Sequence, residues 1–208
     1  MRIAIDGPAA VGKTTVGRAL ADEFDCRFVE TGRMYRAVAL AFDRGIDLEA
    51  IRIEVTESER FLLNGDDVTG LLHTPEYDRK SSEVATRPEV RARLVELQRA
   101  IADGGNVVME GRDIGTVVLP DADVKLFLRA SSEERARRRV KERGMDDFEE
   151  TLQQLAERDA RDAERAVGPL KAARDATIID TDRKTLSEVI SAASSLVREL
   201  SERRCQGG

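Results

Sequence analysis

Short apolar runs alternate with longer helical patterns along most of the chain. The apolar runs cover residues 3–5, 27–29, 107–109, 124–128 and 177–179, and each has the length of a buried strand. Strands that alternate with helices favour right-handed crossovers and a parallel sheet that is covered on both faces. The pattern therefore predicts an α/β fold in which ligands bind at the carboxyl ends of the strands.

Two longer amphipathic patterns predict helices. Pro88 fits the first turn of a helix that continues through Leu94 and ends at the glycine pair 104–105. Apolar residues from Leu186 to Leu200 form one stripe at helical spacing, so this second helix is expected to pack on the core.

Residues 57–80 depart from the alternation. An apolar run at 61–63 is followed by the turn signal Asn64-Gly65-Asp66 and then by Val68. This pattern predicts a small hairpin and, after it, an irregular connection. We expect the segment to be an insertion that determines which small molecule the protein accepts as a substrate.

Composition narrows the class of protein. The 208 residues suit one domain with insertions, and 36% charged residues with 4% aromatic residues suit a helix-rich α/β protein. The net charge of −6 argues against a general affinity for nucleic acid. Cys26 and Cys205 have no metal-ligand spacing, and no apolar segment is long enough to span a membrane. These features favour a cytoplasmic protein without membrane or nucleic-acid partners.

A phosphate-binding loop follows the first strand. The motif GxxxxGK[ST] lies between a predicted strand and a predicted helix, which is the context that it requires. Lys13 is expected to reach the β- and γ-phosphates of ATP, and the Thr14 hydroxyl to be a ligand of Mg²⁺. A glycine turn without nucleotide binding, or a GTPase switch, could carry similar residues, but the chain has no NKxD-type guanine signature. The residues assigned to ATP are Gly7, Pro8, Ala9, Ala10, Val11, Gly12, Lys13, Thr14 and Thr15.

Three further clusters of charge follow strands or lie on a helix that could cover the same edge. A base could stack on Tyr35 and Arg36 could clamp a phosphate, although a packed tyrosine beside solvated arginines is the alternative. A second cluster lies at 110–116. In the third cluster, Arg158, Arg161, Asp162 and Arg165 share one helical stripe, which an ordinary surface ion pair would also explain.

In this order, the motifs closely resemble those of bacterial cytidylate kinases, which belong to the nucleoside monophosphate kinases. The matching segments are GPAAVGKTT, TGRMYR, LNGDDVTG, SSEVATRPEVR, EGRDIGTVVLPDADVKLFLRAS and ERDARDAERAVGPL. The resemblance implies a P-loop NTPase fold with a five-stranded parallel sheet flanked by helices. It implies a single kinase domain with a core at 1–56, 81–141 and 169–208, a monophosphate-binding insertion at about 57–80 and a helical lid at about 142–168.

The resemblance also assigns the acceptor site. It implies that Tyr35 contacts the cytosine and Arg36 the CMP phosphate. Ser82, Arg91 and Asp113 would read the edge of the base, and a hydroxyl, a guanidinium and a carboxylate match the groups that cytosine offers. The other residues implied for CMP are Thr31, Gly32, Arg112, Arg158 and Asp162.

The implied reaction is the Mg²⁺-assisted transfer of a phosphoryl group from ATP to CMP or dCMP by a monomeric enzyme. The acceptor phosphate is already ionised, so we assign no general base and place the catalytic weight on charge neutralisation. A kinase for UMP or a hydroxylated metabolite, and a nucleotide-binding switch protein, are the alternatives. The residues expected to carry catalysis are Lys13, Arg112, Arg158, Arg161 and Arg165.

Overall fold

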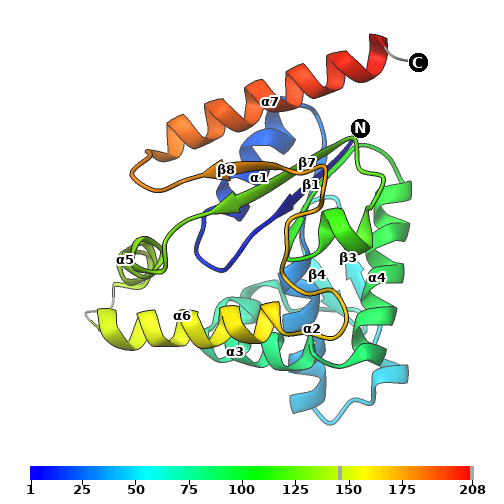
Figure 1. Ribbon diagram of the computed structural model, residues 1–208. Coiled ribbons are helices and arrows are strands. Elements are labelled where there is room, and N and C mark those ends of the chain that lie inside the picture. Colours follow the sequence, from blue (N-terminus) through cyan, green and yellow to red (C-terminus); the bar gives the residue numbers. More distant parts are fainter. Residues whose placement is uncertain (145–146, 207–208) are drawn as a thin grey trace.

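A five-stranded parallel sheet lies at the centre of the molecule, with strand order β2-β6-β1-β7-β8 (Figure 1). The computed structural model describes the backbone of residues 1–144 and 147–206, and the side chains of 1–144 and 147–202. All five apolar runs form strands, as predicted. Their bounds are β1 (Arg2–Asp6), β2 (Arg27–Glu30), β6 (Val107–Gly111), β7 (Val124–Arg129) and β8 (Thr177–Asp180).

Side chains that alternate along β1 build the core on both faces of the sheet. Ile3 and Ile5 pack with α1 and α7, whereas Ala4 belongs to the cluster formed with α2 and α4. In Figure 1, α7 and α1 cover one face, and α2 and α4 lie on the other side. Both predicted helices are present as α4 and α7. The bounds are α1 (Lys13–Glu23), α2 (Thr31–Asp43), α4 (Pro88–Asp103) and α7 (Leu186–Gln206).

The predicted hairpin is present but belongs to a larger antiparallel sheet. Its strands are β3 (Ile53–Val55), β4 (Phe61–Leu63) and β5 (Asp66–Asp67), so the sheet begins before residue 57. Asn64 and Gly65 both have positive φ, of 51° and 92°, as a tight hairpin turn requires. Short helical turns, η1 (Leu48–Ala50) and η2 (Thr69–His73), flank this sheet.

The prediction of an irregular connection after the hairpin is wrong in part, because helix α3 (Pro75–Val84) forms there. Pro75 occupies the first turn, and the Thr74 hydroxyl accepts a hydrogen bond from the Tyr77 N–H at 3.3 Å. The helix is mostly polar and lacks a clear apolar stripe, so hydrophobic periodicity did not reveal it. Its start signal, a threonine N-cap followed by a proline, is the local cause of its first turn.

Helices α5 (Ser132–Arg143) and α6 (Phe148–Ala163) form an arm that packs beside α3 (Figure 1). Residues 145–146 of the predicted lid segment lie outside the described residues. A single π-helical turn, η3 (Ile114–Val118), follows β6 and reaches the end of β1. In the described part of the chain, no helix is both long and apolar enough to cross a membrane.

Candidate active site

A cleft of about 1000 Å³ lies at the carboxyl ends of β1 and β6 and is walled by α2, α3, α5 and α6. It brings together most residues that the sequence singled out, from segments far apart along the chain. Those that line it are Ala9, Ala10, Val11, Gly12, Lys13, Thr14, Thr15, Thr31, Gly32, Tyr35, Arg36, Ser82, Arg91, Arg112, Asp113, Arg158, Asp162 and Arg165.

Three residues that the sequence singled out, Gly7, Pro8 and Arg161, are not among the described residues that line the cleft. A Cβ on Gly7 would lie 2.3 Å from the Leu128 carbonyl oxygen, so this glycine allows the loop to approach β7. The Pro8 carbonyl accepts a hydrogen bond from Lys13 Nζ at 2.7 Å. Arg161 is half-buried elsewhere on α6. Of the four residues on the predicted helical stripe, Arg158, Asp162 and Arg165 line the cleft and Arg161 does not. Nothing in the described part of the structure supports a catalytic role for Arg161.

The phosphate-binding loop has the backbone that its motif requires. Ala10 and Gly12 take positive φ values of 59° and 96°, and Gly12 is the N-cap of α1. This curvature, together with the start of α1, is the arrangement in which backbone N–H groups bind phosphate oxygens.

Lys13 is the first residue of α1 and is buried, with 6% of its surface exposed. Its ammonium group lies 3.8 Å from the Glu110 carboxylate. Burial lowers the pKa of Lys13 and the nearby Arg112 adds to this effect, while burial raises the pKa of Glu110. A buried cation with one distant carboxylate partner would gain from a phosphate placed beside it.

Oxygen donors suited to a divalent cation also meet here. Thr14 Oγ1 lies 3.4 Å from Glu110 Oε1. Mg²⁺ prefers oxygen ligands and keeps several waters or phosphate oxygens, so it needs few protein groups. Within the described residues there is no cluster of three or more His, Cys, Asp or Glu that could hold a metal by itself. The donors therefore fit a Mg²⁺ ion that arrives with a nucleotide.

Asp6, which sequence reasoning missed, fixes the turn after β6. Its two carboxylate oxygens accept hydrogen bonds from the N–H groups of Ile114 and Gly115, both at 2.7 Å. These bonds hold the start of η3 and therefore the neighbouring Asp113. Burial raises the pKa of Asp6 to about 7, although the two N–H groups oppose the shift.

Tyr35, Arg91 and Asp113 form one buried group. Arg91 makes an ion pair with Asp113 and donates a hydrogen bond to the Tyr35 hydroxyl at 3.3 Å. Burial raises the pKa of Tyr35 to about 12 and also raises that of Asp113. The Gly168 backbone covers the pair so closely that a Cβ there would lie 2.3 Å from Asp113 Oδ2.

Asp162 gathers three polar side chains from different elements. Its carboxylate accepts hydrogen bonds from Ser82 Oγ at 3.2 Å and Arg112 Nε at 2.8 Å, and it pairs with Arg165. Burial alone would raise the pKa of Asp162, but Arg112, Arg165 and Arg158 outweigh it and lower the pKa. The carboxylate therefore stays ionised among the arginines.

Two arginine contacts were missed because nothing in a charged helix marks them. Arg135 on α5 donates to the Ala9 carbonyl at 3.3 Å and pairs with Asp159 on α6 at 2.6 Å. It thereby ties the phosphate-binding loop to the arm. Arg139, also on α5, faces Asp78 of α3. From sequence, the arginines of α5 are indistinguishable from a solvated face.

The order of the parallel strands and the loop after β1 define a P-loop NTPase fold. A gluconokinase from Sinorhizobium meliloti superposes with a TM-score of 0.58 at 18% identity, covering 100% of this chain and 97% of that one. A shikimate kinase from Bacteroides thetaiotaomicron gives 0.52 at 17% identity, covering 97% and 98%. These likenesses concern the fold alone.

Sequence comparison identifies the family. The family model described as cytidylate kinase matches residues 3–199. A cytidylate kinase from Mycobacterium leprae is 46% identical, covering 96% of each chain, and one from Pelotomaculum thermopropionicum is 48% identical, covering 90% of this chain and 92% of the other. The chain belongs to the cytidylate kinase family.

Proposed function

We propose that the protein transfers the terminal phosphoryl group of ATP to CMP and dCMP, with Mg²⁺. The observation that carries this proposal is one cleft in which the phosphate-binding loop faces the buried Arg91–Asp113 pair. The loop suits a nucleotide polyphosphate, and the pair suits a polar base edge. Family membership supplies the acceptor that both features accommodate.

On the donor side, the loop N–H groups and Lys13 hold the β- and γ-phosphates. Bound Mg²⁺, held by Thr14 with Glu110 nearby, would neutralise charge on the same phosphates. The depressed pKa of Lys13 recovers when a phosphate is placed beside it, so binding restores the charge that transfer requires.

On the acceptor side, Arg91 and Asp113 offer a donor and an acceptor to cytosine, and Tyr35 packs beside them. Thr31 and Gly32, at the start of α2, line the same part of the cleft. A base of different polarity would leave the buried pair without complementary partners. The cost of such unpaired buried groups is the basis of base selection.

Between the two substrates lie the arginines. Arg36 and Arg112 would bind the acceptor phosphate, and Arg165 would stabilise charge on the migrating group. Asp162 holds Arg112 and Arg165 in place through the contacts described above. No general base is needed because a phosphate monoester is ionised at neutral pH, so alignment and neutralisation account for catalysis.

The lid, predicted at about 142–168, would extend back to include α5, and the monophosphate-binding part, predicted at about 57–80, would extend to the whole of the β3–β5 sheet and α3. Closure of such an arm excludes water, which would otherwise receive the phosphoryl group. Arg135 supports this assignment because it joins the arm to the loop that would hold ATP.

The test is a coupled assay of ADP release with each nucleoside monophosphate as acceptor. CMP and dCMP should give the highest kcat/KM, with UMP well below them. A kinase for another small acceptor would instead respond to that acceptor alone. A switch protein would show slow hydrolysis of ATP or GTP that CMP does not change, and that result would overturn the proposal.

A further inference from the structure

Four arginines converge on one carboxylate that no motif singled out. Asp78, on α3, lies 2.7 Å from Arg36 of α2 and 3.8 Å from Arg158 of α6. From α5, Arg139 approaches at 3.7 Å and Arg143 forms a further ion pair. The carboxylate thus joins α3 to the other walls of the cleft.

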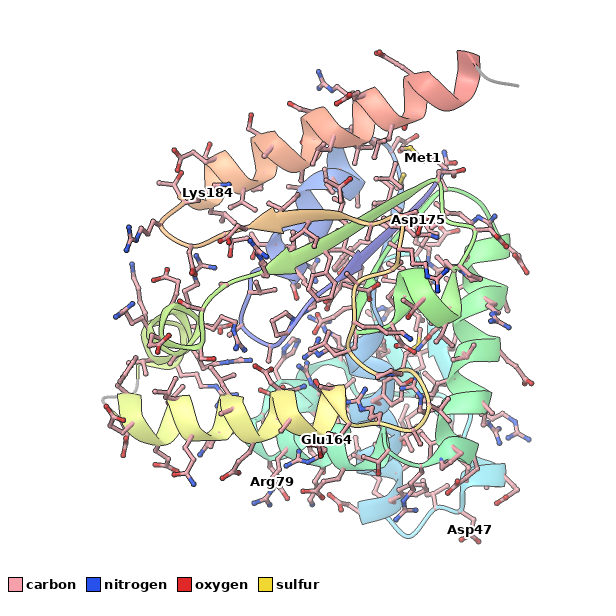
Figure 2. The ribbon with its side chains drawn as sticks, in the orientation of Figure 1. Met1, Asp47, Arg79, Glu164, Asp175 and Lys184 are labelled. Carbon is pink, nitrogen blue, oxygen red and sulfur yellow. The ribbon has the colours of Figure 1, made fainter. Side chains whose placement is uncertain are left out.

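The Asp78 side chain points into the cleft and away from solvent. It lines the cavity and is 14% exposed, whereas its neighbour Arg79 is 69% exposed. Figure 2 shows Arg79 on the outer side of α3, turned away from the sheet. Burial alone would raise the pKa of Asp78, but Arg36 and the other arginines outweigh it and lower the pKa. The group is therefore an anion at neutral pH.

The arginine cluster has more donors than its carboxylates satisfy, although Glu30 also pairs with Arg36 and Glu142 with Arg139. Nε of Arg36 and Nε of Arg158 are buried and have no hydrogen-bond partner among the described residues. A phosphate monoester carries up to two negative charges and three terminal oxygens, against one charge and two oxygens for a carboxylate. The cluster is thus better matched to a phosphate than to Asp78.

We propose that Asp78 is an internal competitor of the acceptor phosphate: its carboxylate occupies Arg36 and Arg158, and the phosphate of the incoming nucleotide replaces it there. The proposal rests on the assignment of Arg36 to the acceptor phosphate under the proposed function. It adds a residue that sets acceptor affinity without belonging to the reacting groups.

The Asp78 carboxylate and the acceptor phosphate would compete because both need the guanidinium of Arg36. A phosphate bound to Arg36 would lie on the same guanidinium as the Asp78 carboxylate, so the two anions would repel each other unless Asp78 withdraws. Each nucleotide that binds must therefore break the contacts of Asp78 with Arg36. Removing the charge at residue 78 should strengthen the binding of any ligand that carries the phosphate, and of no other ligand.

Calorimetric titration in the absence of ATP tests this with CMP and with cytidine, which lacks the phosphate. In Asp78→Asn, we expect the Kd of CMP to fall at least about threefold, the effect of losing one nearby like charge. The Kd of cytidine should not change. Orthophosphate should bind the variant more tightly, and it should compete with CMP.

Asp43→Asn is the matched control. Asp43 also joins α2 to α3, through Lys80 at 2.5 Å, but neither residue lines the cleft. This variant should leave both Kd values as they are in the wild type. If Asp78→Asn does not fold, Asp78→Ser removes the same charge with a smaller side chain, and the same titrations apply.

Weaker CMP binding in Asp78→Asn, or an equal change for CMP and cytidine, would overturn the proposal. The first result would mean that Asp78 positions the arginines for the phosphate. Failure of the proposed function would look different, because the wild type itself would then not phosphorylate CMP. The orthophosphate titration would still decide whether Asp78 competes for the arginines.

Discussion

Arg165 and Asp162 form an ion pair at the carboxyl end of α6, where both line the cleft and their side chains are 6% and 1% exposed. The sequence left open whether Arg158 and Asp162, which lie on one helical stripe with Arg165, form only an ordinary ion pair at the surface. In the structure, Asp162 instead bonds Arg112 and Arg165, while Arg158 faces Asp78. A buried, shared carboxylate is a means to hold arginines at fixed positions.

Arg165→Ala should lower the turnover number by about 10³ or more, the effect seen for arginines that stabilise transferring phosphoryl groups. The variant should stay folded because Asp162 keeps Arg112 and Ser82 as partners. Arg198→Ala is the control, since Arg198 pairs with Glu23 at the exposed surface. That change should leave turnover intact and alter stability by about 0–1 kcal/mol. Less than a tenfold loss in folded Arg165→Ala would contradict the role.

Lys13→Met should lower turnover by about 10²–10³, the effect of losing one electrostatic donor. Burial lowers the pKa of Lys13, so its charged form opposes folding at neutral pH. An uncharged side chain of similar length should therefore leave the free energy of unfolding unchanged or raise it. Assays beside denaturant unfolding check both expectations, with Lys80→Met as a surface control. Lower stability with normal turnover would reverse the assignment.

Asp113→Asn should weaken the use of CMP far more than the binding of ATP. The amide keeps the shape of the side chain but loses the negative charge that pairs with Arg91, and an NH2 donor replaces one of the two acceptor oxygens that the proposed function assigns to the base. The amide also fills the space of the carboxylate, whereas Arg91→Ala would leave a cavity in place of a large side chain that is 2% exposed. Steady-state kinetics with CMP and titration with ATP provide the comparison. An equal loss for both ligands would place Asp113 outside the acceptor site.

The main sheet and the phosphate-binding loop were predictable because their signals are local. Apolar runs of strand length mark β1, β2, β6, β7 and β8, and the GxxxxGK[ST] spacing fixes the loop that follows β1. Helix α3 was missed since it is held by polar contacts and by packing on α2. Local propensity is weak where tertiary contacts decide the structure.

The ionic contacts inside the cleft could not be read from the sequence. Arg36 and Asp78 are 42 residues apart, and Arg135 meets the Ala9 carbonyl 126 residues away. Neither spacing is periodic, and the arginines of α5 all look alike along the chain. Lys13 is buried at the start of α1, and the spacing of the loop motif does not indicate this burial. Which side chains face the cleft depends on how the arm packs beside α3, which no local pattern encodes.

The contribution of Asp6 to the free energy of unfolding should change between about pH 4 and pH 7. The pKa of Asp6 is raised from 3.8 to about 7, so the folded state keeps the proton to higher pH than the unfolded state. Its stabilising contribution is complete below about pH 4 and is lost as the pH rises toward 7. The unfolding free energy of the wild type minus that of Asp6→Asn should therefore fall over this range and level off above it. Denaturant unfolding at several pH values measures the difference, and a rise with pH would contradict the argument.

The α5–α6 arm should open more readily than the rest of the fold. Its apolar anchor is small. Among the described residues, a separate cluster holds only three buried side chains, those of Leu155, Ala9 and Ala136, with Ala10, Phe148 and Leu152 partly buried against them. Polar contacts such as Arg135 with Asp159 supply the rest, and water can replace them. Amide hydrogen exchange in α6 should therefore be faster than in β1 and should slow when ATP and CMP are added together. The later turns of α7, which pack on the core through Ala193 and Val197 and do not line the cleft, are the internal control and should not respond. Slow exchange in α6 that the substrates leave unchanged would mean that the arm is a fixed wall of the cleft, and that water is excluded by some other part of the protein.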